Sequence, residues 1–381
     1  MANPQAKLES PISPAISSVV ERNDAAPQRE SLHDTLVDSI YFGYESLKTT
    51  IRKQVYNEKD LDLPVLDAFK TKPAEAIKVS TNGSSERGID RHLEINSGGR
   101  ERDYILHVPK NYDPSKPMPL VVVLHGLGQD ADRISSLSKM SEKADKEGFI
   151  VAYPNGTKWL GQLRSWDADN GVQLPGTDSN DVGFVKDMVK TIKENMNVDK
   201  DKVYAAGFSN GGMLAYRLAS EMSDTFSAVA VVSSGSSGAE AKPSEAVSIM
   251  SIHGTSDRVV PLEGRAPGQG LSTLGVPRFQ SFGESYKTWA KHLGISHAPL
   301  IERDGDRITS RSVNPETGAE VIAVVVKDGG HEWPGSDRAK AANPNSPEAN
   351  YPTTDKIWEF FKSHKKNSSQ PVQCDDRALV A

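Results

Sequence analysis

The chain contains the stretch Val203-Tyr-Ala-Ala-Gly-Phe-Ser-Asn-Gly-Gly-Met-Leu-Ala-Tyr-Arg-Leu218, in which a short apolar run passes through glycines into a helical pattern. Its centre, Gly207 to Gly211, has the form G-x-S-x-G between a strand and a helix, the context in which this pattern carries an exposed nucleophilic serine. Small residues are needed on both sides of Ser209 because bulky ones would clash at so tight a turn. A helix that starts just after the serine also directs its first N–H groups at an anion formed there. The alternative is a glycine-rich turn that serves only packing in an α/β sheet.

Length and composition narrow the classes of protein that the chain can be. Its 381 residues are enough for one large core with a small appendage. The formal net charge is −6 with both signs mixed throughout, so no basic stripe indicates a nucleic-acid partner. No apolar run approaches the roughly 20 residues of a transmembrane helix. The one cysteine, Cys374, excludes an intrachain disulfide and makes a Cys/His metal cluster an unfavourable interpretation.

The two ends of the chain differ from its middle. Residues 1–30 are rich in Pro, Ser, Ala and Asn and are expected to form a disordered leader. Apolar residues recur three or four apart over 31–57, which predicts an amphipathic helix. We expect this helix to pack on the main domain, and the alternative is a helix that docks on a surface or a partner. A linker then runs to residue 90, and residues 365–381 are expected to be a loose tail.

The folded domain is expected to span residues 91–364. Alternating residues around Leu93 and at 104–108 predict a hairpin of edge strands. A continuous apolar run, typical of a strand buried on both faces, follows at 120–124, and further mostly apolar runs follow at 149–153, 204–206, 228–232, 247–252 and 321–326. Helical patterns separate these runs. Alternating strands and helices predict an α/β fold with a doubly wound, mostly parallel sheet and helices on both faces.

Two candidate partners of Ser209 lie just past the ends of buried strands. A serine needs a base to take its proton, and the base needs an acid that orients it. The strand that ends at Ile252 leads to Asp257, and the strand that ends at Val326 leads to His331. Functional residues collect at the carboxyl ends of strands in such sheets. The order Ser, Asp, His is also the order expected for a nucleophile of this type. The sequence therefore predicts a triad of Ser209, Asp257 and His331.

A glycine turn supplies the fourth part of the site. Strand 120–124 leads into His125-Gly-Leu-Gly-Gln129, where a backbone N–H can point at a developing anion. The candidate donors of this oxyanion hole are the backbone N–H groups of Leu127 and Asn210.

Three other titratable residues compete for roles in this site. His125 precedes the serine in the chain, against the expected order, so we interpret it as a structural residue that bonds within its own loop. His253 is interpreted in the same way. Asp181 is a rival for the triad acid, but its place before a helical pattern predicts a helix N-cap.

With these residues in hand, the chain resembles the esterases that include polyhydroxybutyrate depolymerases and the related feruloyl and acetylxylan esterases. The resemblance covers about residues 91–364. The matching stretches are Leu124-His-Gly-Leu-Gly-Gln129, Tyr153-Pro-Asn-Gly156, Ser165-Trp166, Asp181-Val-Gly-Phe184, Gly207-Phe-Ser-Asn-Gly-Gly-Met213, His253-Gly-Thr-Ser-Asp257 with Val260-Pro261, and Gly330-His-Glu-Trp-Pro-Gly335. The resemblance implies an α/β-hydrolase fold, the same triad, and esters of carboxylic acids as substrates. The chemistry expected of the triad needs no cofactor or metal.

The resemblance leaves substrate, location and competing functions open. Its members act on polymers, on plant cell-wall esters and on small soluble esters. Trp166, Trp333 and the loop Gly264 to Gly275 are candidates for lining the substrate pocket, with core packing as the alternative for the tryptophans. The single cysteine and a first segment without an apolar core favour a cytoplasmic location, and secretion is the alternative. A peptidase, an acyltransferase or a non-catalytic binding protein on the same scaffold are the competing functions.

Overall fold

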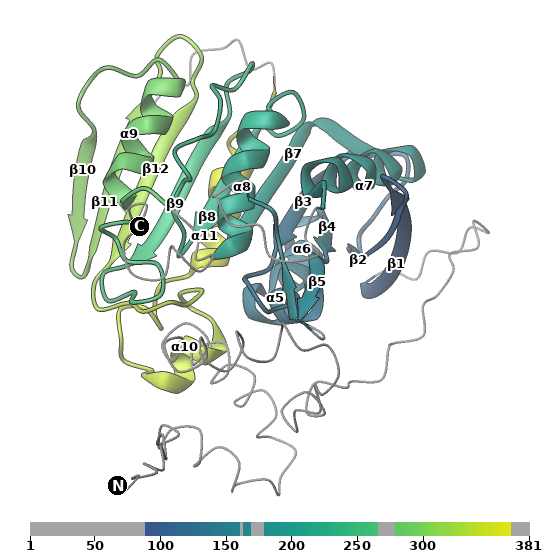
Figure 1. The fold of residues 1–381 in the computed structure, drawn as a ribbon, viewed down its shortest axis with the longest axis horizontal. Coiled ribbons are helices and arrows are strands. Elements are labelled where there is room, and N and C mark those ends of the chain that lie inside the picture. Colours follow the sequence, from purple (N-terminus) through teal and green to yellow (C-terminus); the bar gives the residue numbers. More distant parts are fainter. Residues whose placement is uncertain (1–87, 161–162, 169–178, 266–278, 367–381) are drawn as a thin grey trace, which may run out of the picture. The chain divides into compact units, whose positions relative to one another are not determined.

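The computed structural model describes residues 88–160, 163–168, 179–265 and 279–366 (Figure 1). The expected leader, the helix at 31–57 and the tail beyond residue 366 lie outside the described residues. Most of the loop Gly264 to Gly275 does so as well.

The described chain is organised around a ten-stranded sheet with the order β1-β2-β4-β3-β7-β8-β9-β12-β11-β10. Its strands are β1 (Ile89–Ser97), β2 (Arg100–Val108), β3 (Met118–Leu124), β4 (Ile150–Pro154), β7 (Val198–Phe208), β8 (Ala228–Val232), β9 (Ser248–Gly254), β10 (Leu300–Asp304), β11 (Arg307–Val313) and β12 (Glu320–Val326). The central strands from β4 to β12 pair in parallel, whereas β1 and β2 at one edge and β10 and β11 at the other pair antiparallel. The hairpin and the continuous apolar strands predicted from the sequence are confirmed.

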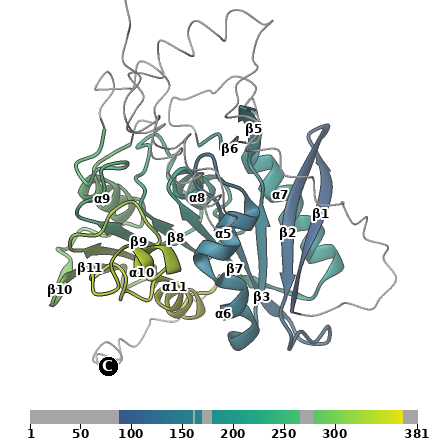
Figure 2. The same ribbon diagram turned by 90° about the horizontal axis from the view of Figure 1, so that it is seen from below.

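Helices cover both faces of this sheet (Figure 2). They are α5 (Ala131–Ser138), α6 (Met140–Glu147), α7 (Asp181–Asn195), α8 (Asn210–Glu221), α9 (Phe282–His292), α10 (Asp337–Ala342) and α11 (Thr353–Lys362). Helices α5, α6 and α11 lie on one face and α7, α8 and α9 on the other, as a doubly wound fold requires. Within the described residues, no helix combines the length and the apolar composition of a membrane span.

Strand register brings the loops that matter for chemistry to one edge of the sheet. Leu124 pairs with Gly207, so β3 and β7 end side by side. Val326 likewise pairs with Gly254, so β12 and β9 end together. The loops that carry the oxyanion candidate, the serine, the aspartate and the histidine therefore all leave from the carboxyl ends of neighbouring strands.

A small two-stranded sheet occupies part of the segment between residues 157 and 180, which shows no strand pattern in the sequence. Strands β5 (Thr157–Leu160) and β6 (Leu163–Ser165) pair antiparallel there. Strands this short and polar leave no periodic signal in the sequence, and the same holds for β10, in which every residue is exposed.

Candidate active site

Ser209 occupies a sharp turn between β7 and α8. It is one of the described non-glycine residues with a positive φ (54°, with ψ −120°), a conformation that costs free energy and tends to occur at functional sites. A Cβ on Gly207 would collide with the backbone of Gly211, and one on Gly211 would collide with the backbone of Leu124 and His125. The expectation that only small residues fit on either side of the serine is confirmed.

The three side chains predicted to act together are joined by hydrogen bonds. His331 Nδ1 lies 2.8 Å from Asp257 Oδ2, and His331 Nε2 lies 2.9 Å from Ser209 Oγ. A carboxylate only accepts hydrogen bonds, so Nδ1 carries the hydrogen atom and donates a hydrogen bond to Asp257. The Nε2 lone pair of the neutral ring then faces the serine hydroxyl. This arrangement can accept the serine proton as Oγ attacks an electrophile.

Asp257 is buried and its carboxylate has several donors. Oδ1 accepts the backbone N–H groups of Val259 (2.9 Å) and Val260 (2.8 Å), while Oδ2 lies 3.3 Å from His253 Nε2 in addition to His331. Burial alone would raise the pKa of this carboxyl group, but His331 and His253 together hold the pKa far below its usual range. Asp257 is therefore ionised near neutral pH, and its hydrogen bonds fix the orientation of the carboxylate.

The two oxyanion candidates present free backbone donors. Asn210 is the first residue of α8, so its N–H belongs to the first helical turn, which has no carbonyl partner within the helix. In the loop after β3, the N–H groups of Gly126, Gly128 and Gln129 have acceptors. Among the described residues, neither Leu127 N–H nor Asn210 N–H has a hydrogen-bond acceptor. Both are thus available to an incoming anion.

The two histidines interpreted as structural do bond within their own surroundings. His125 Nδ1 donates to Gly126 O (2.7 Å) and its Nε2 accepts Gly156 N–H (2.9 Å). Burial lowers the pKa of His125 to about 4, so the ring is neutral and both of its nitrogens are occupied. His253 Nε2 lies 2.7 Å from Val260 O, and the ring also contacts Asp257 as described above.

The interpretation of Asp181 as a helix N-cap is wrong by one residue. Asn180 is the N-cap of α7, and its side chain accepts the N–H of Gly183. Asp181 is instead fully buried and forms an ion pair with Arg102 at 2.7 Å. Two adjacent residues that both favour caps cannot be told apart from sequence alone.

The tryptophans suggested for the substrate pocket are both buried. Trp333 belongs to the hydrophobic core and its indole N–H donates to Thr354 Oγ1 (3.0 Å), which are the contacts expected of the packing alternative. Trp166 is also buried, with its indole N–H on His125 O (2.9 Å) and its ring tilted against the His125 ring. It lies beside the loop His125–Gln129, here called the oxyanion loop, and is therefore part of the scaffold of the site.

Glu348 contacts the site but carried no signal in the sequence. Its carboxylate accepts the N–H of Gly330, the residue before His331, at 3.0 Å. Burial raises the pKa of Glu348, and Asp257 contributes to the rise. A lone glutamate in a loop rich in Asn, Pro and Ser has no periodic pattern and no motif that would mark it.

Among the described residues, no cluster of His, Cys, Asp and Glu is arranged to hold a metal ion.

Comparison with known proteins adds sequence and structural relatives. The family profile described as esterase PHB depolymerase matches residues 103–285. The putative esterase NocK of Nocardia uniformis subsp. tsuyamanensis is 33% identical over 258 residues, which cover 64% of this chain and 73% of NocK. Feruloyl esterase B of Piromyces equi is 29% identical, with coverage of 60% of this chain and 42% of that protein. The solved acetyl xylan esterase from Aspergillus awamori aligns with a TM-score of 0.51 and 18% identity over 71% of this chain and 98% of that one.

These relatives and the sheet define the class as a carboxylic ester hydrolase with the α/β-hydrolase fold. The chain belongs to the family of esterases that includes the polyhydroxybutyrate depolymerases and the feruloyl esterases. It spans less than half of feruloyl esterase B and 31% of the bifunctional acetylxylan esterase/xylanase XynS20E of Neocallimastix patriciarum, to which it is 30% identical.

Proposed function

We propose that the protein hydrolyses carboxylic esters through an acyl-enzyme on Ser209, with His331 as general base and Asp257 as the acid that orients it. The observation that carries this proposal is the run of hydrogen bonds from Asp257 through His331 to a serine on a strained turn. The chemistry needs no further group from the protein beyond donors for the oxyanion.

The reaction balances with these residues alone. Ser209 Oγ attacks the ester carbonyl carbon while its proton passes to His331 Nε2, and the negative oxygen of the tetrahedral intermediate is stabilised by the N–H groups of Leu127 and Asn210. The C–O bond to the alcohol then breaks, and His331 protonates the departing oxygen. Water attacks the acyl-enzyme, gives one proton to His331, and the acid leaves as Ser209 regains its proton.

The relatives of the chain suggest its class of substrate. They include an acetylxylan esterase and a feruloyl esterase, and the matching family profile is that of the polyhydroxybutyrate depolymerases. We therefore propose that the substrate is an acetyl, feruloyl or hydroxybutyryl ester, either a small molecule or an oligomer. A hydrolysis panel of acetylated xylan, methyl ferulate, hydroxybutyrate oligomers and short nitrophenyl esters separates these cases, and a peptide analogue in the same panel tests for amide cleavage.

Replacement of the serine tests the mechanism. Ser209→Ala is expected to lower kcat on a short nitrophenyl ester by about 10⁶-fold, because the covalent route is lost and only binding and the oxyanion donors remain. A fluorophosphonate should label the wild type at Ser209 and leave the variant unlabelled. Near-normal turnover by a folded Ser209→Ala protein would refute the proposal.

A further inference from the structure

One short segment joins the two sides of the oxyanion hole. Arg164 to Asp167, here called the bridging segment, begins in β6 and runs past the nucleophile turn. Its Arg164 carbonyl accepts Gly128 N–H at 2.7 Å, and the Trp166 indole donates to His125 O at 2.9 Å, so it holds the oxyanion loop. The Asn210 side chain brackets the Trp166 main chain, since Oδ1 accepts its N–H (2.8 Å) and Nδ2 donates to its carbonyl (3.3 Å). The same four residues thus bind next to Leu127 and next to Ser209.

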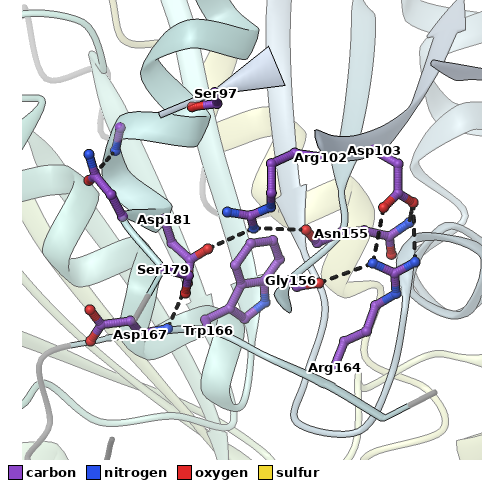
Figure 3. Close-up of polar contacts among 12 residues, drawn as sticks. Ser97, Arg102, Asp103, Asn155, Gly156, Arg164, Trp166, Asp167, Ser179 and Asp181 are labelled. Atoms are coloured by element: carbon purple, nitrogen blue, oxygen red, sulfur yellow. Dashed lines mark hydrogen bonds and ion pairs between the residues drawn. The ribbon is translucent and has the colours of Figure 1, made fainter. Parts of the chain in front are cut away.

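A buried ion pair anchors one end of the bridging segment (Figure 3). Asp181 Oδ2 accepts Asp167 N–H (2.8 Å) and the Ser179 hydroxyl (2.9 Å), while Oδ1 accepts Arg102 Nη2 at 2.7 Å. Arg102 also donates to Asn155 O at 3.0 Å and lies over the ring of Phe184. The Asp181 side chain is fully buried and that of Arg102 is 8% exposed.

The other end of the bridging segment is held by a second polar group. The Arg164 guanidinium donates to the Asp103 carboxylate (3.0 Å) and to Gly156 O (3.1 Å). Gly156 N–H in turn donates to the ring of His125 at 2.9 Å. The segment is therefore fixed at one end by the pair of Arg164 with Asp103 of β2 and at the other by Asp181 of α7. It contacts the oxyanion loop through Arg164 and Trp166.

The burial of the pair between Arg102 and Asp181 is not by itself evidence that the pair stabilises the fold. Burial removes two charges from water, and an apolar replacement for such a pair is often neutral or stabilising. What Leu or Met cannot do is accept the N–H of Asp167 while it holds a second donor in a fixed direction. The hydrogen bonds of the ion pair are thus better explained by the need to orient the bridging segment than by a gain in the stability of the fold.

We propose that Arg102 and Asp181 are positioning residues that align the Leu127 and Asn210 N–H groups of the oxyanion hole by holding the bridging segment. The proposal rests on the proposed function, because it assigns these residues to the same hydrolytic step. They contact neither substrate nor reacting atoms, and they act through the hydrogen bonds of Asp167 and Trp166.

Two double variants separate positioning from folding. Arg102→Met/Asp181→Leu removes both charges together, so no uncompensated charge is left buried, and it deletes every acceptor for Asp167 N–H. Arg102→Met/Asp181→Asn also removes both charges but returns one acceptor oxygen. The matched control is Ser97→Ala/Asp187→Leu, because the Ser97 hydroxyl donates to Asp187 on the same helix α7 at 2.6 Å without any bond to the bridging segment.

The readout is kcat per competent site, with the sites titrated by a fluorophosphonate. We expect the Met/Leu variant to lose roughly 10- to 100-fold in kcat per site, somewhat less than the loss from deleting one oxyanion donor. KM should stay within about twofold of wild type because uniform substrate binding is unchanged. The affinity for a trifluoromethyl ketone, whose adduct with Ser209 carries an oxyanion, should fall in parallel with kcat. The Met/Asn variant should recover most of the loss, and the control should retain wild-type kcat per site.

The outcomes keep this inference apart from the function on which it rests. Wild-type turnover that does not depend on Ser209 would refute the proposed function. Turnover that depends on Ser209, together with unchanged kcat per site in the Met/Leu variant, would refute only the positioning role. Should the Met/Leu variant not fold, Trp166→Phe removes the indole N–H on His125 O, together with part of the ring volume that packs on His125. The same split between kcat and KM is then expected at smaller amplitude, and its absence would overturn the inference.

Discussion

The close approach of the nucleophile turn to the oxyanion loop can be tested at one glycine. Gly211 is the second residue of α8 and does not have a positive φ, so alanine is acceptable to its backbone. Its Cβ would, however, lie 2.5 Å from Leu124 O and closer still to His125 O. Ordinary contact begins near 3.4 Å, so the turn and the loop must separate by at least about 0.9 Å at Leu124 O and by more at His125 O.

That separation acts on the geometry of the transition state. The two proposed oxyanion donors lie on opposite sides of the contact, and a displacement of about 1 Å can cost up to 10²-fold in rate. Gly211→Ala should therefore lower kcat by about 10- to 100-fold, or roughly 1.4 to 2.7 kcal/mol of transition-state stabilisation. The folded state should be affected less, because overpacking costs about 1–3 kcal/mol while alanine regains up to about 1 kcal/mol of helix propensity.

The assay is kcat per fluorophosphonate-titrated site on a short nitrophenyl ester, together with the urea midpoint. Gly330→Ala is the matched control, since Gly330 also lies in the site, next to His331, yet a Cβ there meets no atom within 4 Å. It should keep kcat within about twofold of wild type, as expected for a substitution without a clash. A folded Gly211→Ala protein with wild-type kcat per site would refute the reasoning, and so would equal damage by the two substitutions.

Other predictions concern charges in and around the site. Asp257→Asn should lower kcat about 10⁴-fold. The amide oxygen of the new residue keeps the N–H groups of Val259 and Val260, so its NH₂ group faces His331 and favours the wrong tautomer of the imidazole. Near-wild-type turnover would contradict this prediction. Burial alone would lower the pKa of His107, but hydrogen bonds to Asp90 and Asp145 raise it. The stability from these bonds is therefore full below the unfolded pKa of about 6.5 and is lost as pH rises through the folded pKa of His107. The wild type's urea midpoint should exceed that of His107→Phe by a margin that shrinks from about pH 6 to about pH 9. A margin that stays constant over this range would contradict the role of these bonds. Glu348→Gln, which keeps an acceptor for Gly330 N–H, should retain more kcat per site than Glu348→Ala, and equal values for the two would show that this bond does not orient the loop of His331.

The sequence predicted the centre of the sheet and the β1–β2 edge better than the edge formed by β11 and β10. Strands β3, β4, β8 and β12 are largely buried on both faces and therefore form nearly continuous apolar runs, and β9 is buried throughout with serines between its apolar residues. Strand β10 has no buried residue, and β5 and β6 are too short for a period, so composition alone leaves them as loops. Hydrophobic periodicity reports burial, and elements that bury little stay invisible to it.

Some residues of the site could likewise be predicted from the sequence and others could not. Ser209, Asp257 and His331 each follow a buried strand, so strand ends and chain order were enough to propose that they meet. Arg102 could not be proposed because its partner, Asp181, is distant in the sequence. Glu348 could not be proposed because it binds a backbone N–H, which any acceptor could bind. The partner of a buried charge depends on the tertiary arrangement, and no local pattern encodes it.

Asp181 and Asp257 show why the partner decides the role of a carboxylate. Both are buried, and both use each oxygen for hydrogen bonds. The donor differs in kind: Asp257 faces an imidazole, which can take and return a proton, whereas Asp181 faces a guanidinium, which stays charged at every working pH. Only the first pairing can orient a base during a reaction. The second pairing cannot orient a base and can act only by holding the bridging segment in place, so Asp181 is excluded as the acid of the triad.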